Sequence, residues 1–156
     1  MQGRKPVARA DNVIAGPFAT VPIDEPDWLI EFPGEAWGKR AAELASEKWT
    51  AAVSDMTRMR TLGPENKTAL EMLAVNYARW RLSEAHLAKH GPVVAAPRTG
   101  VPMQNPYLSI ANTASERVIK IEAELGLPPS MRGRVGRVTG QRQSTASADR
   151  FLAAKA

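Results

Sequence analysis

The fold is decided by residues 35–60, EAWGKRAAELASEKWTAAVSDMTRMR, and by the break Leu62-Gly63-Pro64 that follows them. The stretch contains no proline, and its apolar residues recur every three or four positions, as on one face of an α-helix. Gly63 suits the carboxyl end of a helix, and Pro64 suits the first position of the next helix. The pattern therefore predicts a long helix over 35–60 that ends at this break.

A second apolar stripe predicts a helix over 64–89, which Gly91-Pro92 ends. Lys89 and His90 lie near its carboxyl end, where positive charge complements the helix dipole. Two long helices joined by a tight Gly-Pro turn form an antiparallel hairpin.

A third helix is predicted to begin after Asn105, as its N-cap, with Pro106 at the first position, and to end at Gly126. Ile110 and Ile119 lie off its main apolar stripe, so this helix is either deeply buried or shared between subunits. Before it, Pro97-Arg98-Thr99-Gly100 is a good turn sequence, and a short β-hairpin is expected over 92–104. After it, Pro128-Pro129-Ser130 indicates a short fourth helix, with Ser130 as N-cap.

The predicted fold class is therefore mainly all-α: a long antiparallel helical hairpin, a third helix, a short fourth helix, a small β-hairpin and mobile basic tails. Residues 1–34 are expected to form an irregular arm, because they are proline-rich and carry an acidic run from Asp24 to Glu35. Residues 35–127 are expected to be a helical oligomerisation core, and residues 128–156 a basic segment that is mobile from Gly136 onward.

Positive charge is concentrated at the two ends of the chain. Residues 128–156 hold six basic residues and one acidic residue, and residues 1–12 hold three and one. The 115 residues between them hold 12 basic and 14 acidic residues. Basic arms on a near-neutral body are typical of nucleic-acid binders, because lysine and arginine displace counterions from phosphates, although basic tails also simply aid solubility.

The candidate DNA-binding residues lie in these arms. Arg132, Arg134, Arg137 and Arg142 have the planar fork that suits phosphate oxygens and guanine edges. Gly3-Arg4-Lys5-Pro6 is similar to short arms that enter an A·T-rich minor groove, so Arg4 and Lys5 are the candidates there. For both segments the alternative is a solvated tail without a partner.

A second set of candidates combines aromatic and apolar residues at helical spacing. Their spacing favours core or subunit contacts over stacking on single-stranded bases. The set consists of Trp37, Trp49, Tyr77, Trp80, Ile110 and Ile119.

Catalysis and cofactors are not indicated by the sequence. It has no cysteine, which excludes a disulfide framework, thiolate zinc sites and a thiol nucleophile. No phosphate-loop, dinucleotide-binding or nucleophile-elbow motif occurs. His86 and His90 are one helical turn apart, but no third metal ligand is evident, so we predict no metal and no cofactor. No apolar run is long enough to span a membrane, and no membrane association is expected.

Four stretches resemble the small subunit of bacteriophage terminases, and they occur in the expected order along nearly the whole chain. Asn-Pro-Tyr in the third stretch and Gly-Leu-Pro-Pro-Ser in the fourth are the most specific motifs. The stretches are Gly3-Arg4-Lys5-Pro6, residues 73–81 (LAVNYARWR), residues 104–111 (QNPYLSIA) and residues 125–132 (LGLPPSMR).

The resemblance implies a non-enzymatic packaging factor that acts in the host bacterial cytoplasm. Such subunits form homo-oligomeric rings, recognise double-stranded viral DNA at the packaging start site, and recruit and regulate the large terminase subunit, which carries the motor and the nuclease. Two other classes stay open: a helix-turn-helix regulator that binds DNA as a dimer, and a phage head or tail adaptor that binds no DNA.

Overall fold

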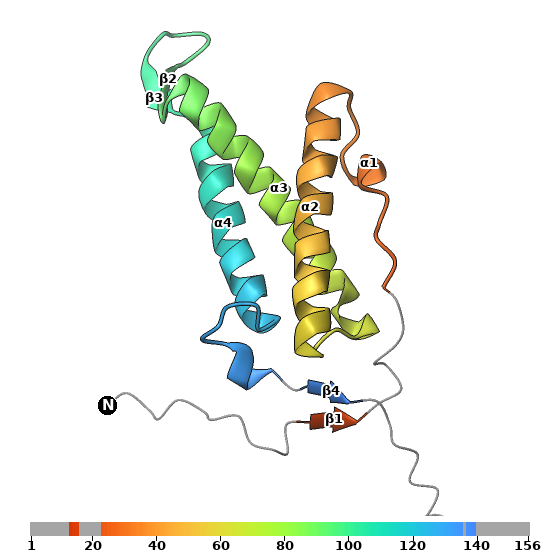
Figure 1. Ribbon diagram of the computed structural model, residues 1–156. Coiled ribbons are helices and arrows are strands. Elements are labelled where there is room, and N and C mark those ends of the chain that lie inside the picture. Colours follow the sequence, from red (N-terminus) through yellow and green to blue (C-terminus); the bar gives the residue numbers. More distant parts are fainter. Residues whose placement is uncertain (1–12, 16–22, 136, 140–156) are drawn as a thin grey trace, which may run out of the picture.

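Three long helices carry the core of the computed structural model, which describes residues 13–15, 23–135 and 137–139 (Figure 1). They are α2 (Ala36–Met59), α3 (Lys67–His90) and α4 (Pro106–Glu124). α3 packs against both of the others, most extensively against α4, while α2 and α4 splay apart toward one end. The prediction of a mainly all-α fold with a long helical hairpin and a third helix is confirmed.

The core owes its close packing to alanine. Ala41 and Ala45 on α2 and Ala74 and Ala78 on α3 are completely buried. Such small side chains let helix backbones approach closely, so few aromatic residues are needed to fill the interior. Leucine, methionine and valine side chains from α2, α3 and α4 complete a single apolar cluster.

A short helix, α1 (Trp28–Glu31), lies against α2. Asp27 caps it by accepting a hydrogen bond from the Leu29 backbone N–H at 3.0 Å. Trp28 and Phe32 are buried, and Trp28 meets Trp49 of α2 edge-to-face at 5.8 Å between ring centroids. The prediction that residues 1–34 are irregular is therefore wrong here, because one helical turn is too short to show a periodic signal yet buries two aromatic rings.

Gly38 allows the chain between α1 and α2 to cross α2 closely. A Cβ atom at this position would overlap the Phe32 carbonyl oxygen and lie 3.2 Å from the Pro33 carbonyl carbon. Both neighbours are backbone atoms, so they cannot move aside as a flexible side chain could.

We therefore expect Gly38→Ala to lower the free energy of unfolding by about 1–3 kcal/mol. This loss would outweigh the gain in helix propensity of about 1 kcal/mol. Urea denaturation followed by tryptophan fluorescence measures the change, and Lys39→Ala at the neighbouring exposed position is the control. A Gly38→Ala protein more stable than the wild type would contradict the close approach.

The turn between α2 and α3 differs in detail from the prediction. Arg60, not Gly63, ends α2, with a left-handed backbone at φ 57° and its N–H donating to the Met56 carbonyl. Gly63 is extended and precedes a 3-10 turn, η2 (Pro64–Asn66), which leads into α3. The Asn66 side chain accepts a hydrogen bond from the Gly63 N–H at 2.9 Å. This local bond favours a tighter first turn than the predicted α-helix.

The predicted β-hairpin is confirmed. Strands β2 (Val93–Ala95) and β3 (Pro102–Gln104) pair antiparallel, with Val94 opposite Met103. The hairpin projects from the end where α3 joins α4 (Figure 1). Val93 and Val101 are exposed on it.

The chain after α4 forms a 3-10 turn and a strand. Gly126 has a φ of 70° and follows the end of α4, as predicted. The predicted fourth helix is instead a 3-10 turn, η3 (Arg132–Arg134), preceded by Met131 as cap in place of Ser130. A strand, β4 (Arg137–Thr139), follows this turn and pairs parallel with β1 (Val13–Ala15), so there is no room for a longer helix.

Strands β1 and β4 correct two further predictions. β1 shows that the segment 1–34 is not irregular throughout, and β4 shows that residues 137–139 of the predicted tail form a strand. The backbone hydrogen bonds of this pair join segments more than 120 residues apart, and short strands of this kind carry no local pattern. Residues 140–156 lie outside the described part of the chain.

Candidate nucleic-acid interface

The basic end of the molecule is built by η3. The close fit of Val135 against Gly126, where an added Cβ would overlap the Val135 side chain, holds this turn below the end of α4. The turn presents Arg132 and Arg134 to solvent. Neither guanidinium forms an ion pair within the described residues, and Arg134 donates only to the Met131 sulfur, at 3.5 Å. Both arginines are therefore available to an anionic partner.

The parallel pairing of β1 and β4 places Val13–Ala15 beside Arg137–Thr139. Val13 lies opposite Arg137, so the point where residues 1–12 join β1 is beside the start of β4, directly after η3 (Figure 1). Of the predicted DNA-binding residues, Arg132 and Arg134 lie in one turn and Arg137 follows them in β4. Arg4, Lys5 and Arg142 lie outside the described residues.

The predicted core or subunit contacts divide into buried and exposed groups. Trp49 is buried against Trp28, so it cannot stack on a base. Tyr77 and Trp80 are half-buried and meet edge-to-face at 6.0 Å between centroids. These three residues belong to the fold of one chain.

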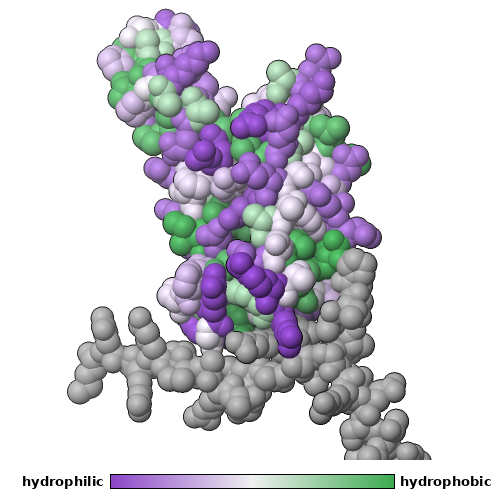
Figure 2. Space-filling model, viewed as in Figure 1, coloured by the Kyte–Doolittle hydropathy of each residue, from purple (hydrophilic) through white to green (hydrophobic). Residues whose placement is uncertain are grey.

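The exposed group consists of Trp37, Ile110 and Ile119. Trp37 is 52% exposed and packs edge-to-face on Phe32. Ile110 and Ile119 are exposed on α4, and their separation of nine residues places them on opposite sides of that helix. These side chains are free for contacts outside the described residues. In Figure 2 apolar surface appears in separate patches along both edges of the helices and on the hairpin, with hydrophilic side chains between them.

A partly buried ion pair connects α2 with α4. Lys48 donates to Glu122, and its ammonium group also lies 5.3 Å from the centroid of the Tyr77 ring on α3. The side chains of Lys48 and Glu122 are 20% and 26% exposed. This contact joins all three long helices at one level of the bundle.

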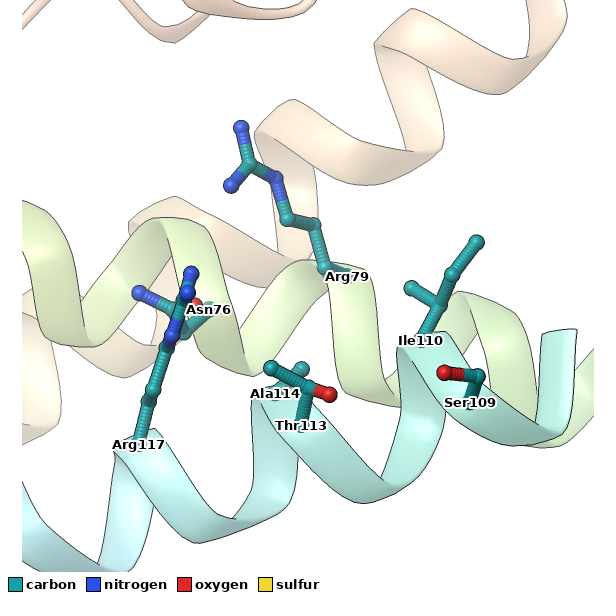
Figure 3. A pocket seen from close by; sticks show the side chains of 7 residues that line it. All are labelled: Asn76, Arg79, Ser109, Ile110, Thr113, Ala114 and Arg117. Atoms are coloured by element: carbon teal, nitrogen blue, oxygen red, sulfur yellow. The ribbon is translucent and has the colours of Figure 1, made fainter.

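Sequence reasoning missed a hollow between α3 and α4, which we call the basic groove. Its lining includes Asn76 and Arg79 on α3 and Ser109, Ile110, Thr113 and Arg117 on α4, around a volume of about 220 Å³ (Figure 3). Arg79 and Arg117 form no ion pair with any described residue. The sequence patterns did not single out Asn76, Arg79 or Arg117 as site residues, because the groove depends on how α4 packs against α3.

The bottom of the basic groove contains an unsatisfied acceptor. Asn76 is 4% exposed, and its amide nitrogen donates to the Met72 carbonyl at 2.7 Å. Its side-chain oxygen has no hydrogen-bond partner among the described residues. A buried amide oxygen without a donor is costly to the fold.

His86 packs against the rings of two other residues. Its ring stacks on Tyr107 at 3.8 Å between centroids and lies 4.3 Å from the ring of His90. Desolvation lowers the pKa of His86, and the nearby His90 and Lys89 lower it further. Within the described part of the chain, no group of three histidine or carboxylate residues is arranged to hold a metal ion.

A family model described as phage terminase, small subunit, matches residues 45–142. The chain belongs to this family. Comparisons with curated proteins and with solved structures gave no match. The resemblance inferred from the sequence is thus confirmed, and the terminase small subunit described here has a role in phage DNA packaging. The family is generally the non-catalytic subunit of the terminase.

The matched region contains both basic features of this terminase small subunit. It begins within α2 and extends past β4, so it includes the basic groove and all the arginines of the 132–142 segment. It leaves out α1 and the N-terminal residues. Within the described residues, no helix is long and apolar enough to cross a membrane.

The Asn-Pro-Tyr motif of the terminase small subunit closes the junction between α3 and α4. Asn105 is 1% exposed, and its side-chain oxygen accepts from the Tyr107 N–H at 3.1 Å while its amide nitrogen donates to the Gly91 carbonyl at 2.9 Å. Pro106 occupies the first turn of α4, and Tyr107 stacks on His86. The motif therefore supports the scaffold and does not line the basic groove.

Proposed function

We propose that this terminase small subunit binds double-stranded viral DNA at the packaging start site through the end of the molecule where η3 meets β1 and β4. The observation that carries the proposal is the parallel pairing of Val13–Ala15 with Arg137–Thr139. It gives the basic N-terminal residues and the basic C-terminal segment a common origin on the surface. One duplex can then contact both.

The charges at this end support phosphate binding. Arg132 and Arg134 are exposed and free of acidic partners among the described residues, so binding DNA would not require breaking an existing ion pair. Arg4, Lys5, Arg137 and Arg142 add positive charge to the same two segments of the sequence. Each arginine that replaces a condensed counterion on DNA contributes to affinity.

Assembly into a cyclic homo-oligomer larger than a tetramer is the second part of the proposal. Large apolar side chains are exposed on α1, α2, α3, α4 and the hairpin, including Ile30 at 77% and Ile119 at 66%. Their positions on several sides of the molecule suit a head-to-tail interface, in which two different surfaces meet. A ring would also act on one duplex with several basic ends at once, which strengthens individually weak contacts.

The proposed division of labour follows the three segments of the chain. Residues 1–34 serve as an arm, residues 35–127 as the oligomerisation core, and residues 128–156 as the basic segment. The subunit itself is proposed to be non-catalytic and to act in the host bacterial cytoplasm, where it recruits and regulates the large terminase subunit. An alternative role for Arg132, Arg134 and Arg137 is to bind an acidic face of the large subunit.

Native mass measurement with and without cognate duplex DNA tests the proposal. We expect one assembly larger than a tetramer at micromolar concentration, and a mass increase equal to the duplex when DNA is added. A monomer or dimer would contradict the ring, and a dimer that binds DNA would favour the helix-turn-helix regulator. An assembly that does not bind DNA would favour the phage head or tail adaptor. ATP hydrolysis that is lost in a point variant of this chain would contradict the non-catalytic role.

A further inference from the structure

The β-hairpin that links α3 to α4 is apolar and exposed. Arg98 is the only charged residue in the segment 91–105. Val94 and Met103 lie opposite each other where β2 pairs with β3, and Val101, two residues before Met103, points to the same side. Val101 is 60% exposed and Met103 is 40% exposed. We call the surface formed by Val94, Val101 and Met103 the hairpin face.

This hairpin requires a further surface to pack on. Its two strands have three residues each, and within the described part of the chain they pair only with each other. A two-stranded hairpin of this kind is marginally stable in water unless another surface covers it. Figure 1 shows the hairpin projecting from the end of α3 and α4. Because it carries a single charge, a partly apolar protein surface suits it better than a nucleic acid does.

The chain itself carries a surface of complementary character. A hollow of about 700 Å³ lies between α1 and α2, and we call it the α1–α2 hollow. Its lining combines apolar side chains with two carboxylates and one ammonium group, and includes Pro26, Leu29, Ala42, Asp27, Glu43 and Lys39. The run from 24 to 35, which contains α1, has five acidic residues and no basic one. A partly apolar hollow in an acidic neighbourhood complements an apolar hairpin whose one charge is Arg98.

The hairpin face and the α1–α2 hollow lie too far apart to meet within one chain. Trp28 of α1 lines the same small cavity as Asn76 of α3, so α1 lies at the level of Asn76. From Asn76 to His90, where α3 ends, the helix continues for 14 residues, which is about 21 Å at 1.5 Å per residue. The hairpin begins beyond that point. In Figure 1 the hairpin and α1 are at opposite edges of the molecule, with α3 and α2 between them.

We propose that the hairpin face of one copy packs into the α1–α2 hollow of a second copy, an inference that rests on the proposed ring. Each copy offers the hairpin at one edge and the hollow at the other. The contact is therefore head-to-tail, and its repetition closes a ring. It covers Val101 and Met103 of one copy and Leu29 of the next, and it brings Arg98 to the acidic neighbourhood of α1.

Site-directed cross-linking tests this interface, because the chain has no cysteine of its own. The double variant Val101→Cys with Ser46→Cys places one thiol on the hairpin face and one in the hollow. A short bis-maleimide should link this protein into covalent dimers, trimers and larger species, since the two thiols of one chain are too far apart to be joined. Either cysteine alone should give no such ladder.

The matched control is Val101→Cys with Thr68→Cys. Thr68 is exposed at the start of α3, at the end of that helix remote from the hairpin, and it does not line the hollow. The control should give at least about 10-fold less linked product, because only thiols held together in an interface have a high effective concentration. A second pair, Met103→Cys with Ala42→Cys, repeats the measurement at other positions of the same two surfaces.

A charge variant measures what the hairpin face contributes to assembly. Val101→Asp with Met103→Asp removes two apolar contacts and brings carboxylates to an acidic neighbourhood, so the concentration needed for assembly should rise by about 30-fold or more. Thr68→Asp with Ser130→Asp makes the same charge change at exposed positions outside both surfaces and should assemble like the wild type. Sedimentation over a range of protein concentrations gives both values.

Three outcomes would overturn the interface. A wild type that stays monomeric would overturn both it and the proposed ring. A wild type that assembles, while neither cysteine pair gives more linked product than the control, would overturn the interface alone. A charge variant that assembles like the wild type but no longer co-purifies with the large terminase subunit would assign the hairpin to that partner.

Discussion

Replacing Arg132, Arg134 and Arg137 together with alanine is expected to lower DNA affinity by roughly 10²–10³-fold at 0.1 M salt, if all three contact phosphate. The log–log salt slope should fall by about 0.9 per lost contact, because fewer counterions are released. Cognate and random DNA should lose affinity to a similar extent, since phosphate contacts carry no base information. Fluorescence anisotropy at several salt concentrations measures both quantities.

The control for this experiment replaces Arg40, Arg58 and Arg98 with alanine, which removes the same charge from exposed positions on the helices and hairpin. Its affinity should stay close to that of the wild type. Changing Arg4 and Lys5 should instead weaken binding to A·T-rich DNA most, if that arm enters the minor groove. If the variant with alanine at 132, 134 and 137 binds DNA normally but fails to co-purify with the large subunit, these arginines contact the large subunit instead of DNA.

Replacing Asn105 with alanine is expected to lower the free energy of unfolding by about 2–4 kcal/mol. The change removes the cap of α4, and it leaves the Gly91 carbonyl without the donor that now lies 2.9 Å away. Urea denaturation at one fixed protein concentration measures it, because assembly makes apparent stability depend on concentration.

Two further variants separate the contributions of Asn105. Asn105→Asp keeps a side-chain acceptor at the start of α4 but loses the donor to Gly91, so its loss should be smaller than that of alanine. Asn112→Ala changes an exposed asparagine within the same helix and should alter stability by less than about 0.5 kcal/mol. A loss for Asn105→Ala no greater than for Asn112→Ala would show that the junction does not depend on this side chain.

Local patterns were enough to predict the long helices and most of their ends, although the turn between α2 and α3 differs in detail. The prolines and glycines at Pro64, Gly91, Pro106 and Gly126 act on the backbone next to them, so their effects are visible without knowledge of the fold. Asn105 was predicted as an N-cap for the same reason, since a cap bonds to an N–H only two residues away. Its second bond, to Gly91, spans 14 residues and was not predicted.

Short elements could not be predicted because their stability comes from distant partners. α1 has four residues and is stabilised by the burial of Trp28 against Trp49 and of Phe32 in the core. β1 and β4 have three residues each and form only through one another. The sequence therefore indicated two basic ends, whereas only the strand pairing placed the residues from which they extend, Val13 and Arg137, side by side.

The sequence by itself determined the helical class, the position of each long helix and the charge of the two ends, because these depend on residues close together in the chain. Only the tertiary structure decided that Arg79 on α3 and Arg117 on α4 share one groove with the buried Asn76. Those residues are separated by up to 41 positions and lie on two helices whose rotation is set by core packing. A hydrophobic stripe predicts which face of a helix is buried, but the polar residues that meet beside that face depend on the contact between the helices.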